Sequence, residues 1–134
     1  MTKRGFTLIE LLVATTIILL LTSVGVVTYQ SAQKKGRDSK RKSDLEQFRA
    51  ALEMYRSDNE LYPIGQWSAA LVALNNGGYL STAPQDPKSY SYYYNSAAGY
   101  SYDLCAYLET GGADDCGSNC GSAPDNCNYK VTNP

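Results

Sequence analysis

The sequence contains no histidine, no Cys-x-x-Cys pair and no glycine pattern of the kind that binds nucleotides. Without histidine, neither a Cys/His nor a Ser/His catalytic pair can exist, and a zinc site would need an unusual set of ligands. We therefore expect a structural or binding protein rather than an enzyme, and no cofactor.

Charge is almost missing between Leu8 and Val27, where Glu10 is the one ionisable residue in a run of 20. A run of this length is about what an α-helix needs to cross a bilayer. The preceding Lys3-Arg4-Gly5 could belong to an ordinary signal peptide, but the apolar run is long for one and has no small-x-small cleavage site at its end. The sequence predicts a helix that spans the membrane and is retained.

No proline occurs before Pro63, so nothing forbids this helix from continuing to Asn59. Gly25 and Gly36 are its weak points, each costing up to about 1 kcal/mol relative to alanine. In its second half, apolar residues recur at steps of three and four, at Leu45, Phe48, Leu52 and Tyr55. This stripe predicts that the second half of the helix packs on a domain.

The rest of the chain is expected to form a small sheet. Strands are predicted at 90–94 and 100–108, with a short helix at 67–74 before them and an edge strand at 127–132 after a loop. One face of the second strand would carry Tyr100, Tyr102, Leu104, Ala106 and Leu108. The predicted fold class is α+β, with a long N-terminal α-helix whose apolar half protrudes and whose amphipathic half packs on an antiparallel sheet.

Twelve tyrosines occur, eight of them from Tyr79 to Tyr107. Tyrosine suits a half-buried strand, so most should be sheet residues. Any that remain exposed could contact a surface or a partner.

The formal net charge of −1 conceals a basic segment followed by an acidic one. Residues 1–42 hold eight Lys and Arg against two acids, and residues 43–134 hold four against eleven. Six of the cations form a neck cluster: Lys34, Lys35, Arg37, Lys40, Arg41 and Lys42. The cluster could contact acids of neighbouring subunits, such as Asp44, Glu46, Glu53 and Glu60. It could instead contact anionic lipid or DNA, or form a solvated helix face.

Four cysteines lie in the last thirty residues, which favours disulfides and a location outside the cytoplasm. The positive-inside rule, applied to the neck cluster, would instead place the head in the cytoplasm. We give more weight to the cysteines, because flanking charge is a bias that specialised insertion can override. Four cysteines permit three pairings, and we favour Cys105 with Cys127 and Cys116 with Cys120.

The segment Lys3-Arg4-Gly5-Phe6-Thr7-Leu8-Ile9-Glu10 resembles the signal of type IV pilins and type II secretion pseudopilins. The resemblance implies that a prepilin peptidase cuts between Gly5 and Phe6, that Phe6 is N-methylated, and that Glu10 meets the Phe6 amine of a neighbouring subunit. The leader motif also supports a head outside the cytoplasm. Without such a partner, Glu10 would be a helix-end carboxylate that reaches the lipid headgroups.

The basic neck, the amphipathic helix and the exit at Tyr62-Pro63 look like the pseudopilin-G-like branch of this superfamily. The resemblance covers residues 1–63 well and the head poorly. Members commonly carry a proline in the buried helix, where this chain has only Gly25, so local helix melting is in doubt. The branch can also hold calcium near its C-terminus, for which Asp114, Asp115 and Asp125 are candidates without a recognisable ligand spacing.

The resulting division is a cleaved leader at 1–5, a membrane or filament-core helix at 6–27, a neck and amphipathic helix at 28–60, and a head at 61–134. The first hypothesis is a subunit of a helical type IV pilus used for adhesion, twitching motility or DNA uptake. It would pass from the inner membrane to an extracellular fibre and depend on prepilin peptidase, an assembly ATPase and inner-membrane platform proteins. The alternatives are a type II secretion pseudopilin in a short periplasmic filament and a membrane-anchored binding module that does not polymerise.

Overall fold

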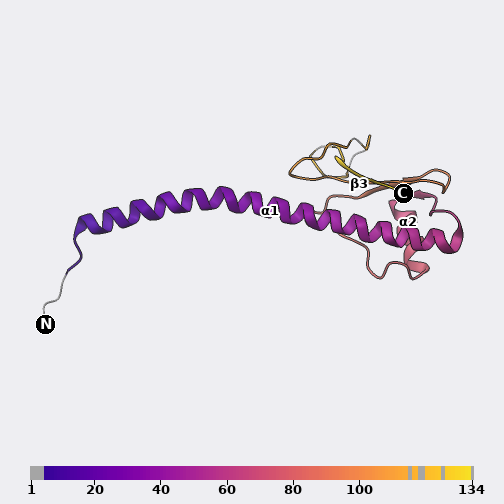
Figure 1. Ribbon diagram of the computed structural model, residues 1–134, viewed down its shortest axis with the longest axis horizontal. Coiled ribbons are helices and arrows are strands. Elements are labelled where there is room, and N and C mark those ends of the chain that lie inside the picture. The colour runs from indigo at the N-terminus through magenta and orange to yellow at the C-terminus, as the bar shows by residue number, and fades with distance from the viewer. Residues whose placement is uncertain (1–4, 115, 118–119, 125, 134) are drawn as a thin grey trace. The chain divides into compact units, whose positions relative to one another are not determined.

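The computed structural model describes residues 5–114, 116–117, 120–124 and 126–133, without the side chains of residues 24 and 27. The elements in chain order are α1 (Leu8–Asn59), β1 (Gly65–Gln66), α2 (Trp67–Asn76), β2 (Tyr93–Ser96), β3 (Asp103–Ala106) and β4 (Tyr129–Thr132) (Figure 1). One long helix and one small antiparallel sheet confirm the predicted α+β, pilin-like class. The chain separates into two compact units between Lys34 and Lys35.

The first unit is helix without a packing partner. Every side chain described from residue 5 to residue 34 is exposed, although most of those up to Leu21 are apolar. The helix runs through Gly25 without a break and is long and apolar enough to cross a membrane. An apolar surface of this extent requires a lipid or protein environment.

In the second unit, the predicted stripe of α1 forms the core. Leu45, Phe48 and Leu52 are fully buried, and Tyr55 packs beside them. The helix ends at Asn59 because the chain turns into the left-handed region at the next residue, where φ is +66°. This confirms the predicted end before Pro63.

The sheet has the order β1-β2-β3-β4, and all neighbours are antiparallel. Alternate side chains face the core formed with α1, namely Tyr92, Tyr94, Leu104, Ala106 and Val131. The residues between them belong to a second buried cluster, in which Cys105, Cys120 and Cys127 contact Tyr93 and Tyr107. The sheet is therefore covered by the helix on one face and by the cysteine-containing loop on the other.

The strand predictions were right in number along the second half of the chain and wrong in extent. The strand expected at 100–108 is only Asp103–Ala106, and Tyr100, expected on the buried face, is 74% exposed. Tyr100 follows Gly99, whose φ of +78° places it in the turn before the strand. The two-residue strand β1 was not predicted, since two residues carry no periodic signal. It exists because Gly65 pairs with Ser96 at the edge of β2.

The predicted disulfide pairing is wrong. The bridges join Cys105 to Cys116 and Cys120 to Cys127, closing sequence separations of 11 and 7 residues. In the sheet register Lys130 lies opposite Cys105, whereas Cys127 comes before β4 begins at Tyr129. Directly opposite residues of an antiparallel pair have Cα atoms about 5 Å apart, close enough for a disulfide, and that position opposite Cys105 is taken by Lys130 and not by Cys127.

Candidate assembly site

Helix α1 begins with reciprocal hydrogen bonds between Thr7 and Glu10. The Glu10 carboxylate accepts the backbone N–H of Thr7 at 2.8 Å and the Thr7 hydroxyl at 2.6 Å, and the N–H of Glu10 is directed to the Thr7 hydroxyl oxygen at 3.4 Å. Since Thr7 immediately precedes Leu8, this is the Thr-x-x-Glu capping box of a helix N-terminus. It fixes the start of the helix and holds the carboxylate at the positive end of the helix dipole.

The expected cleavage point lies ahead of this capped turn. Residues 5–7 are not helical, Phe6 is 82% exposed, and a Cβ added to Gly5 would meet nothing within 4 Å. Cutting between Gly5 and Phe6 would leave the capping box complete, with a new amine next to Thr7. The sequence analysis assigned no role to Thr7, although the Thr-x-x-Glu spacing was a readable signal for it.

The other hydroxyls of the apolar segment are satisfied within the helix itself. Thr15, Thr16, Thr22 and Ser23 donate to carbonyl oxygens three or four residues earlier, at 2.8–3.0 Å. Such bonds let polar side chains enter an environment without water at little cost. Glu10 is thus the charged group that the apolar run must accommodate.

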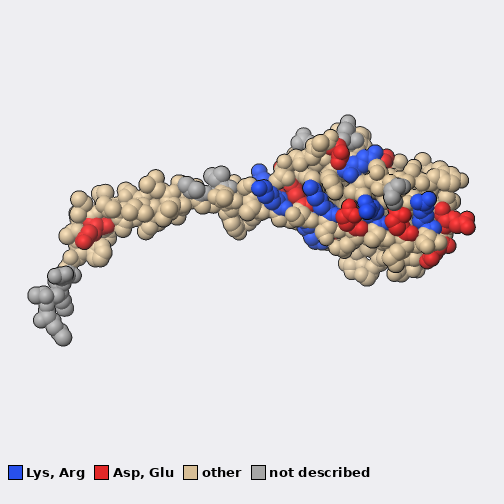
Figure 2. All heavy atoms as spheres, viewed as in Figure 1, with Lys and Arg blue, Asp and Glu red and all other residues tan. Residues whose placement is uncertain are grey.

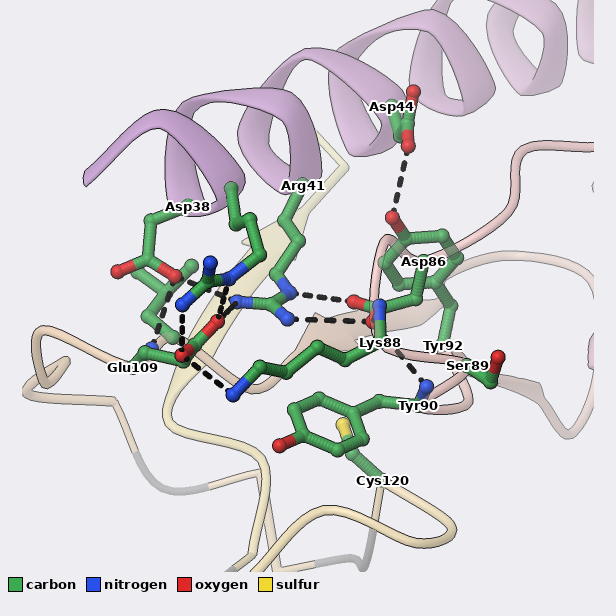
Figure 3. A network of polar contacts seen from close by, with 12 residues as sticks. Asp38, Arg41, Asp44, Asp86, Lys88, Ser89, Tyr90, Tyr92, Glu109 and Cys120 are labelled. Atoms are coloured by element: carbon green, nitrogen blue, oxygen red, sulfur yellow. Dashed lines mark hydrogen bonds and ion pairs between the residues drawn. The ribbon is translucent and has the colours of Figure 1, made fainter. Parts of the chain in front are cut away.

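On the face that Figure 2 shows, charged side chains gather over the second unit, and few lie on the described part of the first. The most deeply buried cation is Arg41, which is 0% exposed. It donates to Asp86 at 2.5 and 3.3 Å, to Asp38 at 2.8 Å and to Glu109 at 3.0 Å (Figure 3). Its guanidinium also lies 5.2 Å from the ring centre of Tyr90. One helix residue thereby joins two loops far along the chain.

Arg37 reinforces the same junction. It donates to both carboxylate oxygens of Glu109, at 2.6 and 2.7 Å, and Lys88 lies 3.1 Å from that carboxylate. The sequence analysis placed Arg37 and Arg41 at a contact with neighbouring subunits or anions, or on a solvated helix face. In the structure both are engaged inside their own head. The spacing of the neck cluster could not show this, because the carboxylate partners other than Asp38 lie about 45 and 70 residues away.

The network also sets the ionisation of its carboxylates. Burial by itself would raise the pKa of Asp38, but hydrogen bonds from the Thr110 hydroxyl, two backbone N–H groups and Arg41 outweigh it and lower that pKa. The hydrogen bond from Arg37 is the main cause that lowers the pKa of Glu109 well below its usual range. Both groups are therefore carboxylates at neutral pH.

The remaining four neck cations divide into two pairs. Lys40 contacts the buried carboxylate of Asp44, and Lys42 lies 5.1 Å from the ring centre of Tyr129. Lys34 and Lys35 are exposed and have no partner among the residues that the structure describes. Of the six residues, these two remain free for a partner outside the chain.

Of the calcium candidates, Asp114 accepts the backbone N–H of Lys130 at 3.2 Å, which occupies an edge donor of β4. Asp115 and Asp125 lie outside the described residues. Within the described ranges, no group of three or more His, Cys, Asp or Glu side chains is close enough to hold a metal ion.

The chain combines an apolar N-terminal helix, whose first turn is capped by Thr7 and Glu10, with a small disulfide-bonded α+β head. These features define a protein of the pilin and pseudopilin class. Residues 28–125 match the family model for type II secretion system protein G, and residues 1–26 match the prokaryotic N-terminal methylation motif. The chain belongs to the type II secretion system protein G family.

Curated relatives carry the same description. Type II secretion system core protein G of Pseudomonas aeruginosa is 32% identical, with 84% of this chain and 89% of the relative covered. Its counterpart in Escherichia coli K12 is 33% identical, with 76% and 79% covered, and that of Klebsiella pneumoniae is 36% identical, with 63% and 69% covered. No solved structure matches the chain. These relatives favour the pseudopilin alternative over the type IV pilus subunit that the sequence analysis placed first.

Proposed function

We propose that this protein is a structural, non-catalytic subunit of the periplasmic pseudopilus of a type II secretion machine. The leader would be removed between Gly5 and Phe6, Phe6 would be N-methylated, and the apolar helices would bundle into a filament. Within that bundle, Glu10 pairs with the Phe6 amine of a neighbouring subunit. Assembly would involve prepilin peptidase, an ATPase and membrane platform proteins.

The observation that carries the proposal is the bare apolar surface of the first unit with a single acid near its start. The described side chains of residues 5–34 are all exposed, and the hydroxyls at Thr15, Thr16, Thr22 and Ser23 are already satisfied. Other copies of the same helix can cover this surface once the subunit leaves the membrane. Glu10 then needs a cation, because an unpaired carboxylate in an apolar bundle is costly.

In the capping box, both contacts to Thr7 use one carboxylate oxygen, Oε2. A carboxylate has about four lone-pair sites, so the other oxygen of Glu10 can accept a neighbour's amine while the cap persists. The cap also limits the rotamers of Glu10, which lowers the entropy lost when the pair forms. Thr7 would therefore be a positioning residue for assembly.

The test is filament formation by the Glu10→Ala variant in cells that carry the full secretion machine. Removing one partner of a buried ion pair costs about 3–5 kcal/mol, so the subunit association constant should fall more than about 100-fold. Glu46→Ala is the matched control, because Glu46 is an exposed acid of the same helix. Cross-linked oligomers in the periplasmic fraction and the mass of the mature N-terminus are measured together.

Loss of oligomers with Glu10→Ala but not with Glu46→Ala, in a chain that begins at methylated Phe6, supports the proposal. Unchanged oligomers would contradict the role of Glu10. A monomer that keeps its function with either substitution would instead indicate the membrane-anchored module. Fibres in the sheared surface fraction of a strain with native expression would favour the pilus reading.

A further inference from the structure

The two unpaired neck lysines stand just past the end of the apolar run. Lys34 and Lys35 follow Val27 by seven and eight residues on the unbroken helix α1. At 1.5 Å per residue they lie about 10–12 Å beyond the end of the apolar run. If residues 8–27 span the hydrocarbon layer, the adjoining headgroup layer, about 5–7 Å thick, ends a few ångströms short of the two lysine backbones. The long lysine side chains can then reach the headgroups.

The residues between have the composition of a membrane interface. Tyr29 is 65% exposed and lies about 3 Å beyond the apolar run, where aromatic rings with one polar end are enriched. Gln30, Ser31 and Gln33 follow, and all are exposed. The order is apolar helix, aromatic ring, neutral polar residues and then two cations.

The acids that might have attracted these lysines on a neighbouring head are largely engaged. Asp44 accepts the hydroxyl of Tyr92 at 2.8 Å, Glu53 accepts that of Tyr62 at 2.9 Å, and Glu46 pairs with Arg49 at 3.4 Å. Of the four acids considered in the sequence analysis, Glu60 alone has no partner among the described residues. Two of the four acids, Asp44 and Glu46, therefore already pair with cations of their own helix, and the position of Lys34 and Lys35 just beyond the apolar run favours a lipid surface.

We propose that Lys34 and Lys35 bind anionic phospholipid headgroups on the head side of the membrane while the subunit is still in the bilayer. The other four cations of the neck are committed inside the head, so these two provide the electrostatic contact with the membrane surface. They set the depth at which the subunit waits before assembly, and that contact must be broken when the subunit is extracted. The lipid contact itself requires only that 8–27 spans the membrane, so it stands even if the filament proposal fails, whereas its role before assembly rests on that proposal.

The experiment uses the full chain reconstituted in phosphatidylcholine vesicles containing a trace of spin-labelled phosphatidylglycerol or spin-labelled phosphatidylcholine. Electron paramagnetic resonance measures the fraction of each lipid that is motionally restricted by the protein. The unaltered chain should prefer phosphatidylglycerol, and each of Lys34→Gln and Lys35→Gln should reduce the preference up to about fivefold at low salt. The Lys34→Arg/Lys35→Arg double variant should keep it, and 1 M salt should weaken it.

Arg49→Gln is the matched control, since it removes one partly exposed cation from the same helix about 21 Å beyond Lys35. It should leave the lipid preference unchanged. The proposal is overturned if Lys34→Gln/Lys35→Gln retains the full preference for phosphatidylglycerol. It is equally overturned if that double variant keeps the lipid preference while its filaments dissociate at lower salt, because the lysines would then bind a neighbouring subunit.

Discussion

Arg41→Met tests whether the head depends on the buried charge network. Methionine is unbranched and can occupy the space of the Arg41 side chain, but it leaves the buried carboxylates of Asp86, Asp38 and Glu109 without their shared donor. Breaking a buried ion pair by removing one partner costs about 3–5 kcal/mol. A domain of this size has a total stability of about 5–15 kcal/mol, so the loss is a large fraction of it.

The single tryptophan provides the assay. Trp67 stacks on Phe48 with ring centres 4.4 Å apart and lies 5.5 Å from Tyr92, so its fluorescence reports on the core of the head. In urea titrations of the full chain in detergent, with the disulfides intact, an m-value of about 1.5 kcal/mol/M predicts a midpoint lowered by about 2–3 M for Arg41→Met.

Lys42→Met is the matched control, because it removes a cation one residue away that is exposed and whose ammonium lies 5.1 Å from the ring centre of Tyr129. It should cost about 1 kcal/mol or less. Arg41→Lys should fall between the two variants, since a lysine keeps the charge but cannot make the two parallel bonds to Asp86. An Arg41→Met midpoint within about 0.3 M of the unaltered protein would refute the reasoning.

Three further predictions concern pH, disulfides and the helix cap. The pKa of Glu109 is lowered in the folded head, so the Glu109 carboxylate stabilises the fold above its unfolded pKa of about 4, and this stabilisation is lost as the pH falls from there toward the folded pKa. Glu109→Gln should therefore flatten the decline in the urea midpoint between about pH 5 and pH 2. An unchanged slope would contradict this. Non-reducing digestion before aspartate residues should leave the Cys105 and Cys116 peptides in one three-peptide complex, and a two-peptide complex lacking Cys116 would restore the pairing expected from sequence. Thr7→Val should lower filament yield less than Glu10→Ala does, because it removes the cap hydroxyl but keeps the carboxylate; equal yields for Thr7→Val and the unaltered chain would exclude a positioning role.

The sequence was a good guide wherever a short local pattern carries the information. The leader motif, the apolar run and the stripe from Leu45 to Tyr55 each lie within a few helical turns, and the match to the protein G family and the observed α1 agree with them. The short helix starting at Trp67 and the last strand were also predicted nearly in place. Patterns of this kind can be read from the sequence, because a helix or a strand repeats its side-chain positions at a fixed spacing along the chain.

The relatives favour the pseudopilus over the type IV pilus that the sequence analysis ranked first. That ranking rested on a tyrosine-rich, cross-linked head, and most of those tyrosines are partly or fully buried, with Tyr92, Tyr94 and Tyr102 in the core. Their hydroxyls are also engaged: Tyr92 donates to Asp44 and Tyr94 to the carbonyl of Pro63. Composition cannot tell a buried tyrosine from an adhesive one.

What the sequence determined by itself was the order of segments along the chain: a leader motif, an apolar helix with one acid, and a small head that contains all four cysteines. Only the tertiary structure decided which cysteines meet and which neck cations remain free. Both depend on strand register and on loops that bring Asp86 and Glu109 to Arg41 from 45 and 68 residues away. No local pattern encodes contacts between such distant residues, because they form only when the whole head packs.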